Sequence, residues 1–343
     1  MDISVVIPVF NAEKTIEACL ASLYGQSQKP IEIIVVDNRS TDGTKDKVLS
    51  TLHHHQEVPT HYLFEVRKGP SFARNRGACE TRGEIIAFMD ADCIADPFWL
   101  IRLSESFYSS DVGAVAGSII GFDKETALGK FHALFTLRAL PSSRLFREFN
   151  LVCGGFPTAN FSIRGKLFHS LRGFDETFPI YAEDYDLCAR IYKSGFQIYF
   201  NKEAVVFHQH RQSLTATWKQ SYGFGTGHAT LLKKHFQRML IIEMPRLRYL
   251  SRRWPLRAWL NIAAADKKFI LCLLLTGLWL PFSAVLALYL VLLYRNMGQR
   301  LEQDQIEADC AEKWALVFLL LFKSLAITCG RWKGSLVQGV LCL

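Results

Sequence analysis

Several features common in secreted proteins are missing from this sequence of 343 residues. Its nine cysteines are scattered and form no Cys-x-x-Cys pair, so we predict reduced thiols in a cytosolic or membrane setting. The opening residues MDISVVIPVF contain no basic stretch, and we expect no signal peptide there. Charged residues make up only 21%, against 50% apolar residues. This balance excludes wholesale disorder and allows a sizeable core.

Acidic charge is also in short supply, since 40 Lys and Arg face 32 Asp and Glu, for a net charge of +8. A basic balance suits nucleic acid, anionic lipid or a phosphorylated ligand. Most of the excess lies in residues 236–268, where eight basic residues face two acidic ones among apolar residues that include Trp254 and Trp259. Because a long apolar run follows, we predict an interfacial helix on an anionic membrane leaflet and no nucleic-acid partner.

Charged side chains are absent from the 26 residues Phe269–Tyr294, and basic residues flank this run on both sides. The run is long enough to span a bilayer, although a buried core helix has the same composition. Trp314–Cys329, interrupted by Lys323, predicts a second crossing or a helix lying along the membrane. The positive-inside tendency places the N-terminal domain in the cytoplasm. The predicted boundaries are a domain at 1–230, a basic amphipathic segment at 231–268, and transmembrane helices at 269–295 and 312–330.

The N-terminal part alternates short apolar runs with polar helical stretches. Ile3–Val9, Ile31–Val36 and Ile85–Met89 are rich in β-branched or apolar residues, which favours buried parallel strands. Lys14–Tyr24 has helical spacing between the first two runs. This alternation predicts an α/β fold with a mostly parallel sheet and right-handed crossovers.

Polar and turn-forming residues follow these strands. Pro8 and Phe10 stand at the end of the first, and Asp37 follows the second. Ligands of open α/β sheets bind at the carboxyl ends of the strands. The Asp37 carboxylate there can accept hydrogen bonds from a ribose or a base. Ser40 and its neighbours also have a plain role as turn and N-cap residues of the next helix.

Two acidic groups stand further along the chain. Asp90 and Asp92 follow the third strand, and buried carboxylates at this spacing are costly without a cation between them. They suit Mg²⁺ or Mn²⁺, which also hold a diphosphate, unless they form a solvated turn. Glu183, Asp184 and Asp186 precede a helical stretch. They form either a site with a general base or an acidic first turn that favours the helix dipole.

The order of these segments resembles that of family-2 glycosyltransferases, which are inverting enzymes with a nucleotide-sugar-binding GT-A fold. The resemblance covers roughly residues 1–230, and the motifs as a set are specific for the family but not for a substrate. Besides the strand ends it includes the following stretches: ARNRG at 73–77, the DxD at 90–92, GGFPTANFSIR at 154–164, GFDE at 173–176, EDYDL at 183–187, and His208.

The resemblance implies a nucleotide-sugar pocket. In that pocket Pro8 and Phe10 line the nucleotide, Asp37 contacts the base or ribose, and Arg74 faces the nucleotide. A uridine diphosphate sugar is the donor that the family favours.

The resemblance also implies a divalent metal site, for Mn²⁺ or Mg²⁺. Asp90 and Asp92 form the DxD, with Asp92 the firmer metal ligand and Asp90 shared with the donor. His208 corresponds to the late histidine that completes the site, and His210 is its close rival.

The family's catalytic base corresponds to Asp184, the aspartate of the Glu-Asp pair, with Glu183 and Asp186 as the nearest rivals. The implied reaction transfers a hexose or N-acetylhexosamine to a hydroxyl or phosphate of a lipid-linked or glycan acceptor at the cytoplasmic membrane face. Glycolipid or polysaccharide biosynthesis fits such a reaction. The Gln-x-x-Arg-Trp motif of processive synthases is incomplete, because Leu250 stands three residues before Arg253. We therefore expect a non-processive enzyme.

Two other classes remain as alternatives. A nucleotidyltransferase also needs acidic metal ligands, but residues 7–13 lack the glycine-rich basic signature expected after its first strand. A catalytically silent, membrane-bound protein that binds nucleotide sugars or acts as a scaffold stays open.

Overall fold

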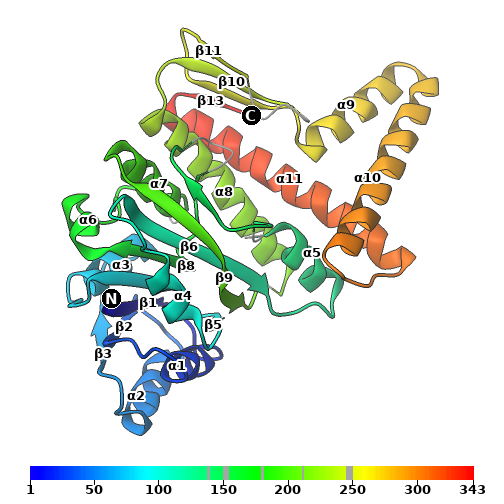
Figure 1. Ribbon diagram of the computed structural model, residues 1–343. Coiled ribbons are helices and arrows are strands. Elements are labelled where there is room, and N and C mark those ends of the chain that lie inside the picture. Colours follow the sequence, from blue (N-terminus) through cyan, green and yellow to red (C-terminus); the bar gives the residue numbers. More distant parts are fainter. Residues whose placement is uncertain (137–139, 150–153, 179–180, 211, 245–249) are drawn as a thin grey trace. The chain divides into compact units, whose positions relative to one another are not determined.

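The computed structural model describes residues 1–136, 140–149, 154–178, 181–210, 212–244 and 250–343 (Figure 1). The chain divides into two compact units. The N-terminal unit comprises residues 1–122 and 137–209, and the C-terminal unit comprises 123–136 and 210–343. This division differs from the predicted boundary at residue 230. Residues 123–136 and 210–230 belong to the C-terminal unit because their helices pack on its longest helix.

Nine strands form the sheet of the N-terminal unit within the described residues, in the order β3-β2-β1-β4-β8-β6-β9-β5, with β7 beside β9. The pairs β1–β2, β2–β3, β1–β4 and β6–β9 are parallel, and the others are antiparallel. The strands are β1 (Ile3–Val9), β2 (Glu32–Asp37), β3 (Thr60–Phe64), β4 (Ile85–Met89), β5 (Cys93–Ala95), β6 (Val112–Gly121), β7 (Arg144–Phe146), β8 (Asn160–Arg164) and β9 (Gln197–His208).

Helices cover both faces of this sheet. Side chains alternate across each strand, so Val5 and Ile7 of β1 enter one core whereas Val6 enters the other. The first core is covered by α1 (Ile16–Tyr24), α2 (Thr44–His54) and α4 (Trp99–Glu105), and the second by α3 (Pro70–Ala78), α6 (Gly165–Ser170) and α7 (Glu183–Lys193). The predicted α/β class with a mostly parallel core sheet is confirmed.

The C-terminal unit combines helices with a small sheet. Its strands are ordered β11-β10-β12-β13. Its elements are α5 (Ala127–Phe135), α8 (Leu214–His235), β10 (Met239–Glu243), β11 (Leu250–Arg253), β12 (Ala258–Asn261), α9 (Ala265–Leu278), the 3₁₀ helix η1 (Leu280–Phe282), α10 (Ser283–Gln303), α11 (Cys310–Gln338) and β13 (Leu341–Cys342).

The basic segment at 231–268 is not the interfacial helix that we predicted. Its first residues complete α8, and its described remainder contains β10, β11 and β12. β10 pairs in parallel with β12, and Trp259 on β12 is fully buried. Tertiary pairing of short apolar runs thus outweighs the helical pattern of basic and apolar residues. Four of the residues behind the prediction lie in 245–249, outside the described residues.

The predicted single helix over 269–295 is wrong as well. α9 ends at Leu278, Trp279 is extended with φ −156° and ψ 118°, and α10 begins at Ser283. Pro281 is the cause, because it lacks an N–H and its ring clashes with the carbonyl of the preceding turn. Two helical stretches among the described residues, Leu280–Gln303 and Cys310–Gln338, are long and apolar enough to cross a membrane. The second extends beyond the predicted 312–330 at both ends.

Candidate functional site

The carboxyl ends of the parallel strands bring the first predicted residues together. β1 lies between β2 and β4, and Val9 is in register with Asp37. Pro8 is partly exposed and Phe10 is exposed. Asp37 is buried, and its carboxylate accepts hydrogen bonds from the Ser40 N–H at 2.8 Å and the Tyr62 hydroxyl at 2.7 Å. Burial and the Asp37 charge together raise the pKa of Tyr62, which therefore stays a hydrogen-bond donor.

The loops after β1 and β2 are tied to each other. The Asn11 side chain accepts a hydrogen bond from the Thr41 N–H at 2.8 Å, and the Asn11 N–H donates to the Ser40 hydroxyl at 3.0 Å. Asn11 and Arg39 both have left-handed backbones, with φ of 51° and 69°. Such conformations are sparsely populated and persist where the surrounding contacts hold them. These two loops, which lie beside Phe10 and Asp37, are therefore preorganised.

Arg74 joins two of the acidic motifs. It lies on α3 and is almost fully buried, and its guanidinium donates to Asp90 and to Glu183, each at 2.9 Å. Burial opposes the charge of Arg74, but the two carboxylates outweigh this effect and raise its pKa. A fixed guanidinium thus links the DxD to the Glu-Asp pair.

The Glu-Asp pair begins α7. Ala182, just before the helix, has a left-handed backbone with φ of 80°, and Glu183 and Asp184 form the first turn. Burial raises the pKa of both carboxyls. The Asp184 charge raises the pKa of Glu183 further, and Arg74 opposes these effects. Adjacent carboxyls of this kind share protons and titrate as a pair. The site therefore holds a carboxyl group that can take up a proton near neutral pH.

Asp186, a rival for the role of base, has a structural partner. It is fully buried and forms an ion pair of 2.8 Å with Arg190, one turn along α7. The Arg190 guanidinium also donates to the carbonyls of Leu171 and Gly173. Asp186 therefore anchors the helix, and Asp184, which is partly exposed, is the better-placed candidate.

The two glycines that begin the GGFPTANFSIR stretch support the start of α7. A Cβ atom on Gly155 would lie 2.5 Å from the Tyr185 ring, and Gly154 has φ of 86°. The Cys188 thiol contacts the Phe156 carbonyl at 3.8 Å. Glycine thus lets this loop lie directly against the helix that carries Asp184.

The ARNRG motif holds the site in a second way. Asn75 donates to the Phe174 carbonyl at 2.9 Å and accepts from the Phe174 N–H at 2.8 Å. A Cβ on Gly77 would lie 2.5 Å from Val6, so this glycine allows α3 to approach β1 closely. Sequence reasoning gave no role to Asn75, although its place beside Arg74 in the motif was a usable signal.

The candidate metal ligands meet where β5 pairs with β9. Cys93 is in register with His208, and the His208 Nε2 lies 3.3 Å from an Asp92 carboxylate oxygen. In the described part of the chain, Asp92, Cys93 and His208 form the one group of three whose ligand atoms lie within 4.8 Å of one another. Burial raises the pKa of the Cys93 thiol, with a further rise from Asp92. A carboxylate oxygen and an imidazole nitrogen fit Mn²⁺ or Mg²⁺ with phosphate oxygens, whereas a protonated thiol does not.

This arrangement separates residues that the sequence grouped together. Asp90 is paired with Arg74 and is not among the three clustered residues. His210 belongs to the C-terminal unit, where its ring stacks on His132 at 5.2 Å. The geometry therefore favours Asp92 and His208 as ligands. Cys93 and Tyr62 belong to none of the sequence motifs, so no sequence pattern indicated their place in the site.

Comparison with known proteins agrees with this geometry. Residues 4–172 match the family model described as "Glycosyl transferase family 2". The chain contains a glycosyl transferase family 2 domain. The match covers the strand-end residues Pro8, Phe10 and Asp37, together with Arg74 and the DxD. It ends before the Glu-Asp pair.

The curated relatives are glycosyltransferases of several kinds. The chain is 28% identical to the pre-mycofactocin glycosyltransferase of Mycobacterium tuberculosis over 68% of its own length and 48% of the relative's. It is 30% identical to the amylovoran biosynthesis glycosyltransferase AmsB of Erwinia amylovora, over 57% and 65% of the two lengths. It is 26% identical to the GalNAc(5)-diNAcBac-PP-undecaprenol beta-1,3-glucosyltransferase of Campylobacter jejuni, over 67% and 73%. The chain thus spans about half the length of the mycobacterial relative.

Solved structures share the fold. The mannosyltransferase PcManGT from Pyrobaculum calidifontis, in complex with GDP-Man and Mn²⁺, superposes with a TM-score of 0.57 at 17% identity, over 97% of this chain and 86% of that one. GalNAc-T7 with UDP, GalNAc and Mn²⁺ has a TM-score of 0.53 at 15% identity, over 68% and 48%. The domain therefore has a GT-A-like fold.

Proposed function

We propose that this protein is an inverting glycosyltransferase. In this proposal it moves a sugar from a nucleotide sugar, with a uridine diphosphate sugar favoured, to a lipid-linked or glycan acceptor at the cytoplasmic membrane face. The observation that carries the proposal is the Arg74 bridge. Arg74 ties the DxD carboxylate Asp90 to the Glu183–Asp184 pair, next to the Asp92–His208 pair. A donor site and a base are thereby linked within one unit.

Pro8, Phe10 and Asp37 suit binding of the nucleotide. The exposed ring of Phe10 offers an apolar face, and the partly exposed Pro8 adjoins it. Asp37 has two internal hydrogen bonds and retains lone pairs for a base or ribose. The preorganised loops between these residues lower the ordering cost of binding.

Asp92 and His208 would hold a divalent ion, which when bound supplies positive charge to offset the charge that develops on the departing diphosphate. Mn²⁺ in two structural neighbours supports this part of the proposal. Arg74 adds a fixed cation that orients Asp90 and Glu183. Asp184 accepts the proton of the acceptor hydroxyl as its oxygen attacks the anomeric carbon. A carboxylate base without an enzyme nucleophile leads to inversion.

The relatives support the acceptor class. The Campylobacter relative's name specifies an undecaprenol-linked acceptor, and the Erwinia relative's name specifies amylovoran biosynthesis. Two apolar helices support membrane association by length and composition. The incomplete Gln-x-x-Arg-Trp motif supports non-processive transfer.

The proposal is tested by transfer to lipid. The full chain in mild detergent is incubated with Mn²⁺, radiolabelled nucleotide sugars and a lipid extract containing polyprenyl phosphates and glycolipids. We expect one sugar to enter the organic phase, and Asp184→Asn to abolish that transfer. If the protein binds the donor but neither transfers the sugar nor hydrolyses the donor under any of these conditions, the catalytically silent alternative is favoured.

A further inference from the structure

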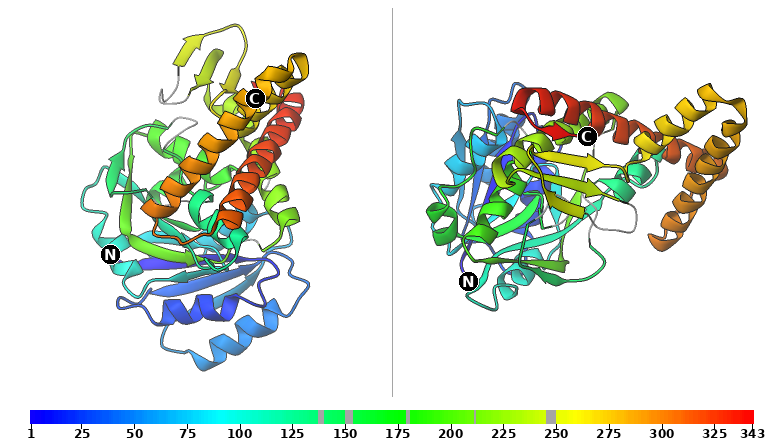
Figure 2. Two further views of the ribbon diagram at one scale, coloured as in Figure 1. Left: turned by 90° about the vertical axis from the view of Figure 1, so that its right-hand side faces the viewer. Right: turned by 90° about the horizontal axis from the view of Figure 1, so that it is seen from above.

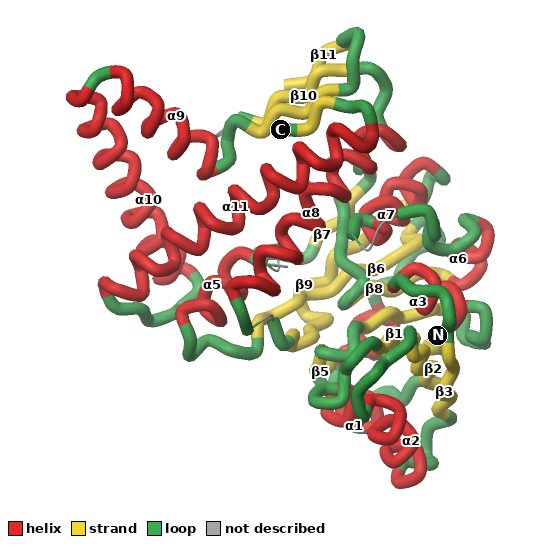
Figure 3. Tube along the Cα trace, turned by 180° about the vertical axis from the view of Figure 1, so that it is seen from behind, coloured by secondary structure: helices red, strands yellow, loops and turns green. Residues whose placement is uncertain are grey.

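The helices α9 and α10 form a hairpin whose outer half is apolar and uncovered. We call residues Phe269–Tyr294 the apolar hairpin. Figures 1 and 3 show its tip standing away from α11, and the yellow and orange segment in the right panel of Figure 2 agrees. Leu278 is 81% exposed and Leu280 is 75% exposed. Other large apolar side chains that are exposed on the apolar hairpin are Ile270, Leu271, Leu273, Leu274, Trp279, Val285, Leu288, Val291 and Leu292.

Charge occurs only at the base of this hairpin. Lys267 and Lys268 precede it and Arg295 follows it, with no charged side chain between them. The Tyr289 hydroxyl donates to the Ala265 carbonyl at 3.0 Å, which ties the second turn of α10 to the start of α9. The apolar turn at Trp279 lies at the opposite end. Lipid can therefore receive the hairpin tip first, with Lys268 and Arg295 left at the headgroups.

The uncharged part of each arm is too short to cross a bilayer, although Leu280–Gln303 as a whole has the length and composition of a span. The uncharged part of α9, Phe269–Leu278, has ten residues and rises by about 15 Å. The hydrocarbon core is about 30 Å thick. The first arm thus matches one leaflet.

The turn between α10 and α11 packs on α5 within the C-terminal unit. Leu301 and Ile306 pack with Phe131 of α5, and Lys130 of α5 pairs with Glu312 at 2.7 Å. α5 begins at Ala127, five residues after Phe122, the last residue of the first stretch of the N-terminal unit. Five residues reach at most about 18 Å, which is less than the hydrocarbon core of about 30 Å.

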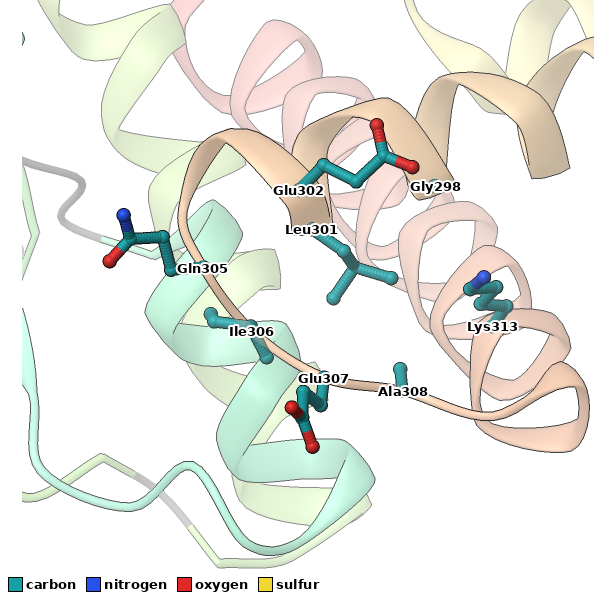
Figure 4. Close-up of a pocket in the computed structure, with 8 residues that line it drawn as sticks. All are labelled: Gly298, Leu301, Glu302, Gln305, Ile306, Glu307, Ala308 and Lys313. Atoms are coloured by element: carbon teal, nitrogen blue, oxygen red, sulfur yellow. The ribbon is translucent and has the colours of Figure 1, made fainter.

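Figure 4 shows the polar character of this turn. Four of the eight residues that line an open pocket there are polar, namely Glu302, Gln305, Glu307 and Lys313, while the apolar Leu301 and Ile306 are buried. Such a surface suits water or headgroups and not hydrocarbon. The end of α10 at this turn therefore stays outside the bilayer.

The far end of α11 is tied to α8. Arg331 donates to His228 of α8 at 3.2 Å, and a Cβ on Gly330 would lie 2.0 Å from the Tyr222 carbonyl oxygen. α8 begins at Leu214, six residues after His208 of β9. The Arg331 end of α11 is thus held beside the C-terminal half of α8.

We propose that the apolar hairpin is a re-entrant anchor that enters one leaflet of an anionic bilayer and returns to the same side. The membrane is the occupant because an uncharged tip of leaflet depth stands between the cationic Lys268 and Arg295. This inference rests on the membrane location in the proposed function and not on sugar transfer. It replaces the predicted span at 269–295 with a hairpin that returns to the side from which it enters.

Flotation tests the lipid contact. The full chain is mixed with phosphatidylcholine vesicles, with and without phosphatidylglycerol, and centrifuged in a density gradient. We expect the protein to float best with anionic vesicles, and the double substitution Leu278→Glu with Leu280→Glu to reduce floating at least tenfold. Leu336→Glu is the matched control, because Leu336 on α11 is 86% exposed but lies outside the hairpin. It should float normally.

Equal floating of the hairpin variant, or equal loss in the control, overturns the proposal. Both variants must keep the melting temperature and the nucleotide affinity of the parent in detergent. That readout separates a failed anchor from a failed donor site. A lipid-free dimer that the hairpin substitutions dissociate, with floating unchanged, would instead assign the hairpin to a second copy of the chain.

Maleimide labelling tests whether the chain crosses. Cys79 follows α3 in the N-terminal unit and Cys310 begins α11, and both are free and exposed. In sealed vesicles, an impermeant maleimide should label both from the same side, as mapped by peptide mass spectrometry. Ser283→Cys at the tip should be labelled from neither side. Labelling of Cys310, or of the tip, from the side opposite Cys79 would show a true crossing and overturn the proposal.

Discussion

The imidazole of His208 lies 3.3 Å from the carboxylate of Asp92. The two residues are 116 positions apart, and the pairing of β5 with β9 brings them together, with Cys93 opposite His208. The Gln209 N–H also donates to the Asp92 carbonyl at 2.9 Å, which fixes the backbones on both sides of the pair. The position of the late histidine is therefore set by sheet register and not by a flexible loop.

This relationship predicts different effects of substituting the two neighbouring histidines. His208→Ala should weaken Mn²⁺-dependent nucleotide binding by roughly tenfold to a hundredfold, the range for a lost metal-site partner. His210→Ala is the matched control and should leave the metal titration unchanged. Isothermal titration calorimetry with and without Mn²⁺ measures both. If His210→Ala loses more of the Mn²⁺-dependent nucleotide binding than His208→Ala, then His210 and not His208 is the metal ligand.

Asp184→Asn should separate binding from transfer. The amide keeps the size of the side chain but cannot take up a proton, so turnover should fall by roughly a hundredfold or more. Nucleotide-sugar affinity should stay within about threefold, because the proposed mechanism places Asp184 at the acceptor and not at the nucleotide. Near-normal transfer by this variant would exclude Asp184 as the base.

The rate should depend on pH through the Glu183–Asp184 pair. Burial raises the pKa of both carboxyls, so the base form appears only as pH rises above the usual carboxyl range. Turnover should therefore increase with pH on an acid limb whose midpoint lies above about 4, the pKa of a free carboxyl. Glu183→Gln should retain such a limb and Asp184→Asn should remove it. A profile that is flat from pH 4 upward would contradict this expectation.

Arg74→Lys should damage both stability and donor binding. A lysine ammonium cannot reproduce the forked contacts with Asp90 and Glu183, so one carboxylate is left without its partner. The free energy of unfolding should fall by about 1–3 kcal/mol, as expected for a buried polar group that loses its bond. Urea denaturation measures the loss. Arg76→Lys is the control, because Arg76 belongs to the same motif but is exposed and pairs with Glu80. It should change the free energy of unfolding little.

Gly155→Ala should act on α7 through sterics. A methyl group would lie 2.5 Å from the Tyr185 ring, and overpacking of this kind costs about 1–3 kcal/mol. We expect a lower melting temperature together with slower transfer, because Tyr185 is next to Asp184. Gly195→Ala is a control for space, since nothing lies within 4 Å of its added Cβ. Its φ of 83° still makes it slightly destabilising, but transfer should be unaffected.

The core strands and the acidic motifs were predictable from the sequence. Ile85–Met89 is bounded as predicted because continuous apolar runs mark strands that are buried on both faces. Asp90 was assigned to the metal as well as the donor, and its pairing with Arg74 depends on how α3 packs, which local patterns do not reveal. β10 and β12 were mistaken for a helix because their pairing is long-range. The break at Trp279 did have a local signal in Pro281, but the uncharged run of 26 residues outweighed it.

The central claim is that the N-terminal unit holds a nucleotide sugar with the help of a metal. The most direct measurement is the melting temperature of the full chain in detergent with a panel of nucleoside diphosphates and nucleotide sugars, each with and without Mn²⁺ or Mg²⁺. A ligand that binds only the folded state raises its stability by mass action. We predict a metal-dependent rise with one nucleotide family that Asp92→Ala removes. The absence of any shift across the panel, or a shift that Asp92→Ala leaves intact, would contradict the claim.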